Sequence, residues 1–562
     1  MQTFLFFKKN CKIWEQKVYK HGLPILITRK DMSEPKKVGR RTFLNYAIAV
    51  VATGVIVSAA TYFAVPKGVT TVTAPGTTVT TTVTTTVTGT PITSPTVTPG
   101  GFPTTKEGLE KLYSSIADKY FSMLMDAAKK SSIDWGQFKG KVTSLNCSIR
   151  QGPDNDAFIR SAGMFKELTG ITINFDFTPE VQQREKVSVD ILSKTGAYHL
   201  PMIDNMHLVK YVKSGAMEGL NKYLEDPKLT DKDFFKPDDI YPEIIKAAGA
   251  PPFGEPGEIY AIPSYTGFHH CMQYYRKDLF DKYGLSVDDI DTFDKLMETA
   301  AKLNNPSNGI YGFVSRGMRG EGMNVFTWQV FHRGFGGQWF DKNWHPIFNT
   351  PETVDAIKAY VDIMTKYGPP GVENYDFAAT LSAAGEGKVA IGLDCDCWST
   401  LLWNPANAKE NVLGKVFAYR VPKGKGGRHA GFFFWSFGIP VGIKTENEKK
   451  AAWLFSEFIN SPYNIAAGQA IGGFIVPPRK STWDLLDAVN GIPPNDYEKY
   501  KKISQEQDAH YDDRPMIPEW PEVGDVVGIA LSSALAKERT PQQAADWAQG
   551  EIDKIMKQAG YY

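Results

Sequence analysis

The chain has 562 residues, which is too long for one hydrophobic core, so two or three structural units are expected. Its 42% hydrophobic and 22% charged residues are those of an ordinary globular protein. The net charge of +1 gives no reason to expect nucleic acid or an acidic polymer as a partner.

The first strong feature is an apolar run at residues 46–65, preceded by a basic cluster at residues 36–41. A helix of that length, rising about 1.5 Å per residue, spans the roughly 30 Å hydrocarbon core of a bilayer. The basic cluster predicts that residues 1–45 stay in the cytoplasm. Arg40 and Arg41 resemble a twin-arginine export signal. Because no Ala-x-Ala cleavage site follows the run, an uncleaved anchor is favoured over a removed signal.

Residues 66–105 are rich in threonine and proline, and 16 threonines lie between Val69 and Gly100. Such a segment has too little apolar surface to offset the entropy that it would lose on ordering. The composition is typical of an extended, disordered stalk. An anchor in the membrane lipid followed by a stalk predicts a single-pass protein whose remaining residues lie outside the cell.

From residue 106 onward, strand-like and helix-like patterns alternate, which predicts α/β domains with largely parallel sheets. Gly170 is placed to end one helix. Thr540 is predicted to cap the last helix, with Gln543 closing a capping box. The other predicted elements are strands at 141–145, 171–177 and 389–393, a polar loop at 146–155, and helices at 158–168, 354–364 and 451–459.

Several stretches carry a resemblance to one known family, among them FKELTGITI (165–173), SGAMEGL (214–220), YYRKDLF (274–280) and WSFGIP (435–440). In this order and spacing, the chain resembles the extracellular solute-binding proteins of ABC importers, in the sugar-binding branch related to maltose- and trehalose-binding proteins. The likeness covers residues 139–562. The anchor and the stalk are also similar to those of archaeal members of this class.

The resemblance implies a two-lobed fold of the periplasmic-binding-protein type II class, with a hinge and a ligand cleft between the lobes. The implied ligand is a sugar or related polyol, which the protein would deliver to ABC permease subunits with their cytoplasmic ATPase. No cofactor and no enzymatic activity are implied. The implied boundaries are 106–262 plus 428–473 for lobe 1, and 263–427 plus 474–562 for lobe 2.

A membrane-anchored extracellular hydrolase acting on carbohydrate is the alternative from another functional class. The chain has many carboxylates, but it contains no GxSxG or HExxH motif. No carboxylate pair stands out at the spacing of a glycosidase either. These absences make the receptor the favoured interpretation.

Strand ends supply the first candidate ligand contacts, since an open α/β sheet presents polar groups there. Arg150 and Gln151 lie in the loop predicted after the first strand, similar in place to a family ligand loop, with a solvated turn as the alternative. Asp204 and Asn205 follow an apolar pair and resemble the family's ligand-contacting acidic position. Tyr265 matches an aromatic residue of the family's hinge loop.

Aromatic faces and a second polar pair complete the predicted site, because sugars present both C–H faces and paired hydroxyls. Arg319 and Glu321 offer a guanidinium and a carboxylate on a flexible loop, with a surface salt bridge as the alternative. Trp328 lies shortly after them. Trp398 and Trp435 resemble family residues that stack on sugar, with core packing as the alternative for both.

Three further features leave alternatives open. Arg184 is similar to a family arginine at the cleft edge, although a solvated helix face fits equally well. His269 and His270 are adjacent on a predicted strand and point to opposite faces, so they could not readily share a metal ion, and no metal site is expected. Buried thiols are favoured over a disulfide for the cysteines of the second lobe, which are Cys271, Cys395 and Cys397.

Overall fold

The computed structural model describes residues 105–152, 155–265, 271–471, 477–488, 502 and 513–562, together with two short strand pairs nearer the N-terminus. The chain divides into two compact units, Met1–Gly100 and Gly101–Tyr562. The first unit contains two antiparallel strand pairs: β1 (Val18–Lys20) with β2 (Leu23–Ile25), and β3 (Val72–Ala74) with β4 (Thr77–Val79). The second of these pairs falls within the predicted stalk.

The predicted membrane helix at residues 46–65 lies outside the described residues. Among the helices that the structure does describe, none is both long and apolar enough to cross a bilayer. Membrane anchoring therefore stays a prediction from the sequence.

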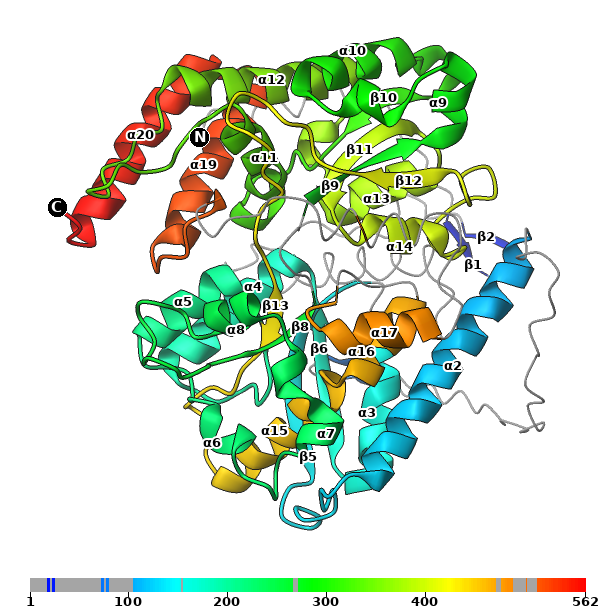
Figure 1. The fold of residues 1–562 in the computed structure, drawn as a ribbon, viewed down its shortest axis with the longest axis vertical. Coiled ribbons are helices and arrows are strands. Elements are labelled where there is room, and N and C mark those ends of the chain that lie inside the picture. The colour runs from blue at the N-terminus through cyan, green and yellow to red at the C-terminus, as the bar shows by residue number, and fades with distance from the viewer. Residues whose placement is uncertain are drawn as a thin grey trace. The chain divides into compact units, whose positions relative to one another are not determined.

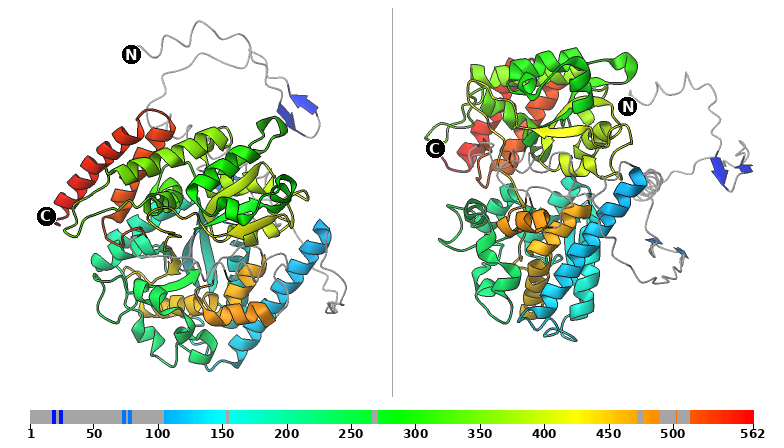
Figure 2. Two further views of the ribbon diagram at one scale, coloured as in Figure 1. Left: turned by 45° about the horizontal axis from the view of Figure 1, so that its top comes forward. Right: turned by 45° about the vertical axis from the view of Figure 1, so that its right-hand side comes forward.

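The second unit consists of two α/β lobes, which appear as two separate groups of helices and strands in Figures 1 and 2. In the first lobe two strands pair in parallel, and three further strands form an antiparallel sheet in the order β7-β13-β8. The strands are β5 (Ser144–Arg150), β6 (Thr172–Thr178), β7 (Met202–Asp204), β8 (Ile262–Tyr265) and β13 (Trp435–Phe437).

Helices surround the first-lobe strands, with the long helix α2 along the outside of the lobe (Figure 2). Its apolar face packs on α16, because Tyr120, Phe121 and Leu124 recur at helical spacing and are buried. The helices of this lobe are α2 (Lys106–Lys130), α3 (Asn155–Thr169), α4 (Glu180–Ser193), α5 (Asn205–Lys213), α6 (Asn221–Leu224), α7 (Lys232–Phe235), α8 (Pro242–Ala248), α15 (Glu446–Ile459), α16 (Pro462–Ile471) and α17 (Lys480–Ala488).

The second lobe is built on one four-stranded sheet in the order β10-β11-β9-β12. Its strands are β9 (Cys271–Arg276), β10 (Tyr311–Val314), β11 (Val389–Cys395) and β12 (Val416–Tyr419). Its helices are α9 (Lys277–Tyr283), α10 (Phe293–Leu303), α11 (Phe326–Gly334), α12 (Pro351–Tyr367), α13 (Phe377–Gly385), α14 (Trp398–Trp403), α19 (Trp520–Leu535) and α20 (Pro541–Gln558).

Neither lobe has the largely parallel sheet predicted from the alternation of elements. Only β5–β6 and β10–β11 pair in parallel among the named strands, whereas β13 runs antiparallel to β7 and β8, and β9 runs antiparallel to β11 and β12. The reason lies in the chain path. β9 and β13 each follow a passage of the chain from one lobe to the other, so each enters its sheet in the reverse direction.

The position of helix α17 differs from the prediction that the residues after 473 belong to the second lobe. The Tyr120 hydroxyl of α2 donates to the carbonyl of Leu485 in α17 at 3.1 Å. Just before α17, Arg479 donates to the carbonyls of Phe235 and Lys236 at 2.7 and 2.8 Å. These contacts attach α17 to the first lobe.

The helices predicted from apolar spacing are present, and the capping box of α20 forms as expected from Thr540 and Gln543. Gly170 ends α3 with a φ of +77°, the left-handed conformation that glycine adopts without strain. The predicted polar loop at 146–155 is wrong, because β5 continues through Arg150. Polar side chains are accommodated there because the interior supplies partners, as where the Gln183 side-chain amide donates to the Ser148 hydroxyl at 3.4 Å.

Candidate functional site

A small cavity of about 40 Å³ lies between the two lobes. In this arrangement it has room for about one water molecule and is too small for a molecule of sugar size. It is lined from the first lobe and the segment leading into β13 by Arg150, Glu180, Arg184, Phe433 and Trp435, and from the second lobe by Arg316, Gly322, Phe326, Phe377, Cys395 and Cys397.

Trp435 lines the first-lobe wall. It begins β13, where its cross-strand neighbours are Asp204 on β7 and Tyr265 on β8. The strand register therefore brings three of the predicted site residues to one end of one sheet. The guanidinium carbons of Arg150 and Arg184 lie 5.7 and 5.0 Å from the centre of the Trp435 ring, within the range of cation–π contact.

Arg184 is held in the cleft by two carboxylates. Its Nε donates to Asp204 Oδ2 at 2.7 Å, and its Nη1 lies 2.9 Å from Glu180 Oε1, one helical turn earlier on α4. Burial alone would raise the pKa of Asp204, but His207 and Arg184 outweigh burial and hold that pKa well below its usual range. Of the two interpretations left open for Arg184, the cleft edge is the observed one.

The second-lobe wall carries a buried ion pair between Arg316 and Asp394. Arg316 Nη2 and Nε lie 2.6 and 3.0 Å from Asp394 Oδ1, and Nη1 donates to the Gly322 carbonyl at 2.8 Å. Burial alone would lower the pKa of Arg316, but the charge of Asp394 raises it above its ordinary value. Sequence reasoning missed Arg316. The signal was its place just after the strand β10, the same argument that selected Asp204.

Aromatic rings form the remaining walls. Phe433 packs edge-on against Trp435, with 5.5 Å between ring centres, and Phe326 packs edge-on against Phe433 at 6.2 Å. The Arg316 guanidinium lies 4.4 Å from the centre of the Phe326 ring and 5.1 Å from that of Phe377. A cavity with apolar faces and paired charged groups offers stacking surfaces and hydrogen-bonding groups to a polyhydroxylated molecule.

The family model described as "Bacterial extracellular solute-binding protein" matches residues 153–465, more than half of the chain. The chain belongs to that family. The matched region includes the strands β7, β8 and β13 and nearly the whole of the inter-lobe cavity.

Known relatives of this solute-binding protein include a mannitol-binding protein of Pseudomonas aeruginosa, 28% identical over 67% of this chain and 85% of its own. A solved solute-binding protein of Agrobacterium radiobacter in complex with ribitol is 28% identical, with a TM-score of 0.64, covering 74% of this chain and 98% of its own. Another, from Agrobacterium vitis with bound D-mannitol, is 26% identical, with a TM-score of 0.62, covering 75% of this chain and 99% of its own.

Four other predicted residues of this solute-binding protein do not line the cavity. Gln151 and Arg319 are exposed. The side-chain oxygen Oδ1 of Asn205 accepts from the Phe434 backbone N–H at 3.1 Å, so this buried side-chain amide fastens the segment that precedes β13. Glu321 Oε1 accepts from Arg514 Nη1 at 2.6 Å and from the Trp520 indole at 3.0 Å, which ties it to the start of α19.

Trp328 and Trp398 are fully buried in the second lobe and do not line the cavity. Trp328 stacks on His332, with 4.8 Å between ring centres. Trp398 stacks on Tyr274 at 5.4 Å. For Trp398 the placement matches core packing, which was the alternative interpretation, and Trp328, predicted as a ligand contact, is packed in the interior in the same way. Tyr265 ends β8, and its side chain lies outside the described part of the structure.

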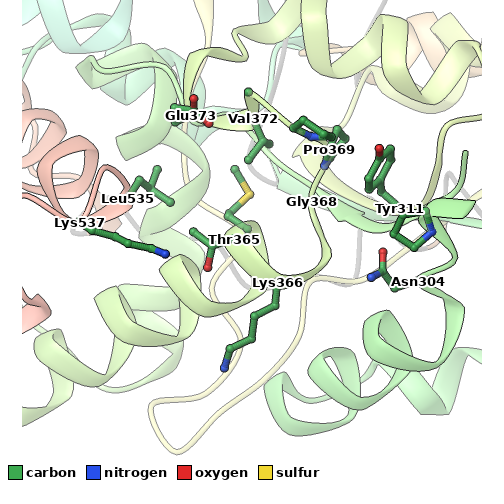
Figure 3. A pocket seen from close by; sticks show the side chains of 14 residues that line it. Asn304, Tyr311, Thr365, Lys366, Gly368, Pro369, Val372, Glu373, Leu535 and Lys537 are labelled. Carbon is green, nitrogen blue, oxygen red and sulfur yellow. The ribbon is translucent and has the colours of Figure 1, made fainter.

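A larger cavity, of about 340 Å³, lies on the second lobe alone (Figure 3). Side chains of α12, including Thr365 and Lys366, border it, together with Lys537 beyond the end of α19. None of the ligand-binding residues predicted from the sequence lines this cavity. Since it contacts a single lobe, a molecule bound there would not be enclosed by lobe closure.

Proposed function

We propose that this chain is the extracellular receptor of an ABC importer and captures a polyol or small sugar between its lobes. One observation carries the proposal: Trp435, with Arg150 and Arg184 against its ring, lines one cavity together with Arg316, which is paired with the buried Asp394. The indole would cover the C–H face of the ligand, while guanidinium and carboxylate groups would bind neighbouring hydroxyls.

The charges around the cavity favour a neutral ligand. The three arginines that line it are matched by three carboxylates, of which Glu180 and Asp204 bind Arg184 and Asp394 binds Arg316. Only Glu180 of these carboxylates lines the cavity itself, but the six groups together carry no net charge and give an anionic ligand no net attraction. The relative named for mannitol binding, and the two solved with ribitol and D-mannitol, support the same chemistry.

The remaining parts of the proposal rest on the sequence. Residues 46–65 would anchor the protein in the membrane and residues 66–105 would hold the lobes outside the cell, as in the archaeal proteins that the N-terminal region resembles. The permease and its ATPase would be the partners that accept the ligand. The hydrolase alternative has no support among the relatives described above. Release of hydrolysis products from an oligosaccharide incubated with the protein would support it.

The experiment is a calorimetric titration of the full chain with D-mannitol, ribitol and maltose, repeated for Trp435→Ala and for the control Trp344→Ala. Trp344 is 38% exposed and is not among the residues that line this cavity. We expect at least one of the three to bind, and Trp435→Ala to weaken that binding by about 2 kcal/mol, the usual loss for a central aromatic contact. If Trp435→Ala binds the ligand as tightly as the wild type does, the proposal that the ligand binds in this cavity is wrong.

A further inference from the structure

Two cysteines lie side by side on the second-lobe wall of the inter-lobe cavity. Cys395 ends β11, and Cys397 precedes the first residue of α14, so that Asp396 alone separates them. Both side chains line the cavity, and their sulfur atoms are 2.7 Å apart. The rest of the cavity wall is aromatic and charged, so the sulfur pair is a separate chemical feature of the site.

The surrounding structure holds this turn from both ends. The Cys395 backbone N–H donates to Asp394 Oδ1 at 2.7 Å, and the Tyr274 hydroxyl donates to the Cys395 carbonyl at 2.6 Å. On the other side, the buried Trp398 ring stacks on Tyr274. The sulfur atoms are therefore brought together by the fold of the sheet and helix and not by chance rotation of surface side chains.

The sulfur of Cys271 has a different hydrogen-bond partner from those of Cys395 and Cys397. It is the cross-strand partner of Cys395 in the β9–β11 ladder, but its sulfur donates to the Phe326 carbonyl at 3.7 Å. Cys147 lies in the first lobe, where its sulfur donates to the Leu200 carbonyl at 2.8 Å. Among the described cysteines, the close sulfur pair is that of Cys395 and Cys397.

We propose that Cys395 and Cys397 are a redox modification site in the wall of the ligand cleft, where a small-molecule disulfide oxidises them to an intramolecular disulfide. One cysteine thiolate attacks a sulfur of the reagent and releases one molecule of thiol, which takes up the proton. The second cysteine thiolate then attacks the sulfur of the first cysteine in the mixed disulfide and releases the second thiol. The two cysteines lose two electrons and two protons, and the reagent gains both.

Access to the thiols runs through the cleft. Cys395 and Cys397 are 4% and 6% exposed, and burial raises the pKa of the Cys395 thiol, which keeps it in the unreactive protonated form. Separation of the lobes hydrates this wall and exposes the pair. The extracellular location proposed above supplies an oxidising environment in which such a disulfide persists.

The first test measures the disulfide directly and needs no ligand. The full chain is treated with oxidised glutathione, alkylated and digested with trypsin, which places both cysteines on one peptide of residues 389–409. We expect this peptide to be lighter by two hydrogen atoms and to take up no alkyl group, while Cys147→Ser behaves as the wild type. Cys395→Ser and Cys397→Ser should each give a peptide with one glutathione. A wild-type peptide that is doubly alkylated, or that carries two glutathiones, would overturn the proposal.

The second test couples the site to ligand binding and rests on the proposed function. D-mannitol is titrated into the oxidised and the reduced protein, and we expect affinities that differ about fivefold or more, the lower end of coupling between linked sites. The double variant Cys395→Ser/Cys397→Ser should bind equally in oxidant and reductant. Equal affinity of the two wild-type states would overturn the coupling. If D-mannitol binds neither state, the polyol assignment fails, and the peptide masses still decide the disulfide.

Discussion

Asp394 and Arg316 are buried together under the second-lobe wall, and the Thr380 hydroxyl donates to the same carboxylate at 3.2 Å. Asp394→Asn would leave the Arg316 charge buried without its counter-charge. We expect the free energy of unfolding to fall by about 3–5 kcal/mol, measured by urea denaturation. The control is Asp118→Asn, which removes the exposed ion pair with Arg160 and should cost less than about 1 kcal/mol. Similar losses for the two variants would contradict this prediction.

The raised pKa of His429 is expected to make the stability of the fold depend on pH. Burial alone would lower its pKa, but its hydrogen bond to Asp513, 2.7 Å between His429 Nδ1 and Asp513 Oδ1, raises the pKa above its ordinary value. The folded state therefore binds this proton more tightly than the unfolded state. The resulting stability is fully present below the ordinary histidine pKa, near 6.5, and is lost as the pH rises through the raised folded pKa.

The measurement compares wild type with His429→Gln by denaturation at about pH 6 and about pH 9. We expect the stability difference in favour of the wild type to be larger at the lower pH. His332 and His199 have lowered pKa values and act in the opposite direction, but they are present in both proteins and cancel in the difference. A difference that does not change with pH would show that the His429 charge contributes nothing.

The helix α20 is closed at its start by a reciprocal pair of hydrogen bonds. The Gln543 backbone N–H donates to the Thr540 hydroxyl at 3.2 Å, and the Thr540 N–H donates to the Gln543 side-chain oxygen at 3.0 Å. Thr540→Ala removes the first bond and should lower the free energy of unfolding by about 1 kcal/mol. Gln542→Ala, at an exposed position of the same turn outside the cap, is the control. Equal effects of the two substitutions would contradict the capping argument.

At the scale of the whole molecule, Gly322 lies where the two lobes come into contact. A side chain there would lie 2.0 Å from Arg184 Nη1, which belongs to the opposite lobe. Gly322→Leu should hold the lobes apart. We expect about tenfold weaker polyol binding, the result of reducing the closed population to about a tenth. Small-angle scattering should show that the wild type contracts with ligand and that the variant does not.

The control for that experiment is Gly550→Leu on α20, where nothing lies within 4 Å of the added carbon. This variant should contract with ligand as the wild type does. A ligand drives closure only if it contacts both lobes, because it must bind the closed state more tightly than the open one. If saturating ligand leaves the wild-type radius of gyration unchanged, the hinged-receptor mechanism is wrong.

Local patterns in the sequence determined the helices and their caps, and pointed to Trp435 as a residue of the inter-lobe cavity. The Thr540 cap, the Gly170 stop and the WSFGIP stretch depend on residues within a few positions of one another, so they can be read along the chain. Asp204 could be predicted for the same reason, because it ends an apolar strand. The prediction of a two-lobed receptor came from the family resemblance, to which the WSFGIP stretch contributes.

Which side chains face the cleft was decided only by the tertiary structure. The Arg316 side chain is held at the cavity by an ion pair with Asp394, which is distant in the sequence. Arg319 is exposed instead. Trp398 enters the core because Gly392 on β11 leaves room for its indole, and a side chain there would lie 2.5 Å from that ring. Such choices depend on contacts between segments far apart in the chain, and spacing along the sequence does not record them.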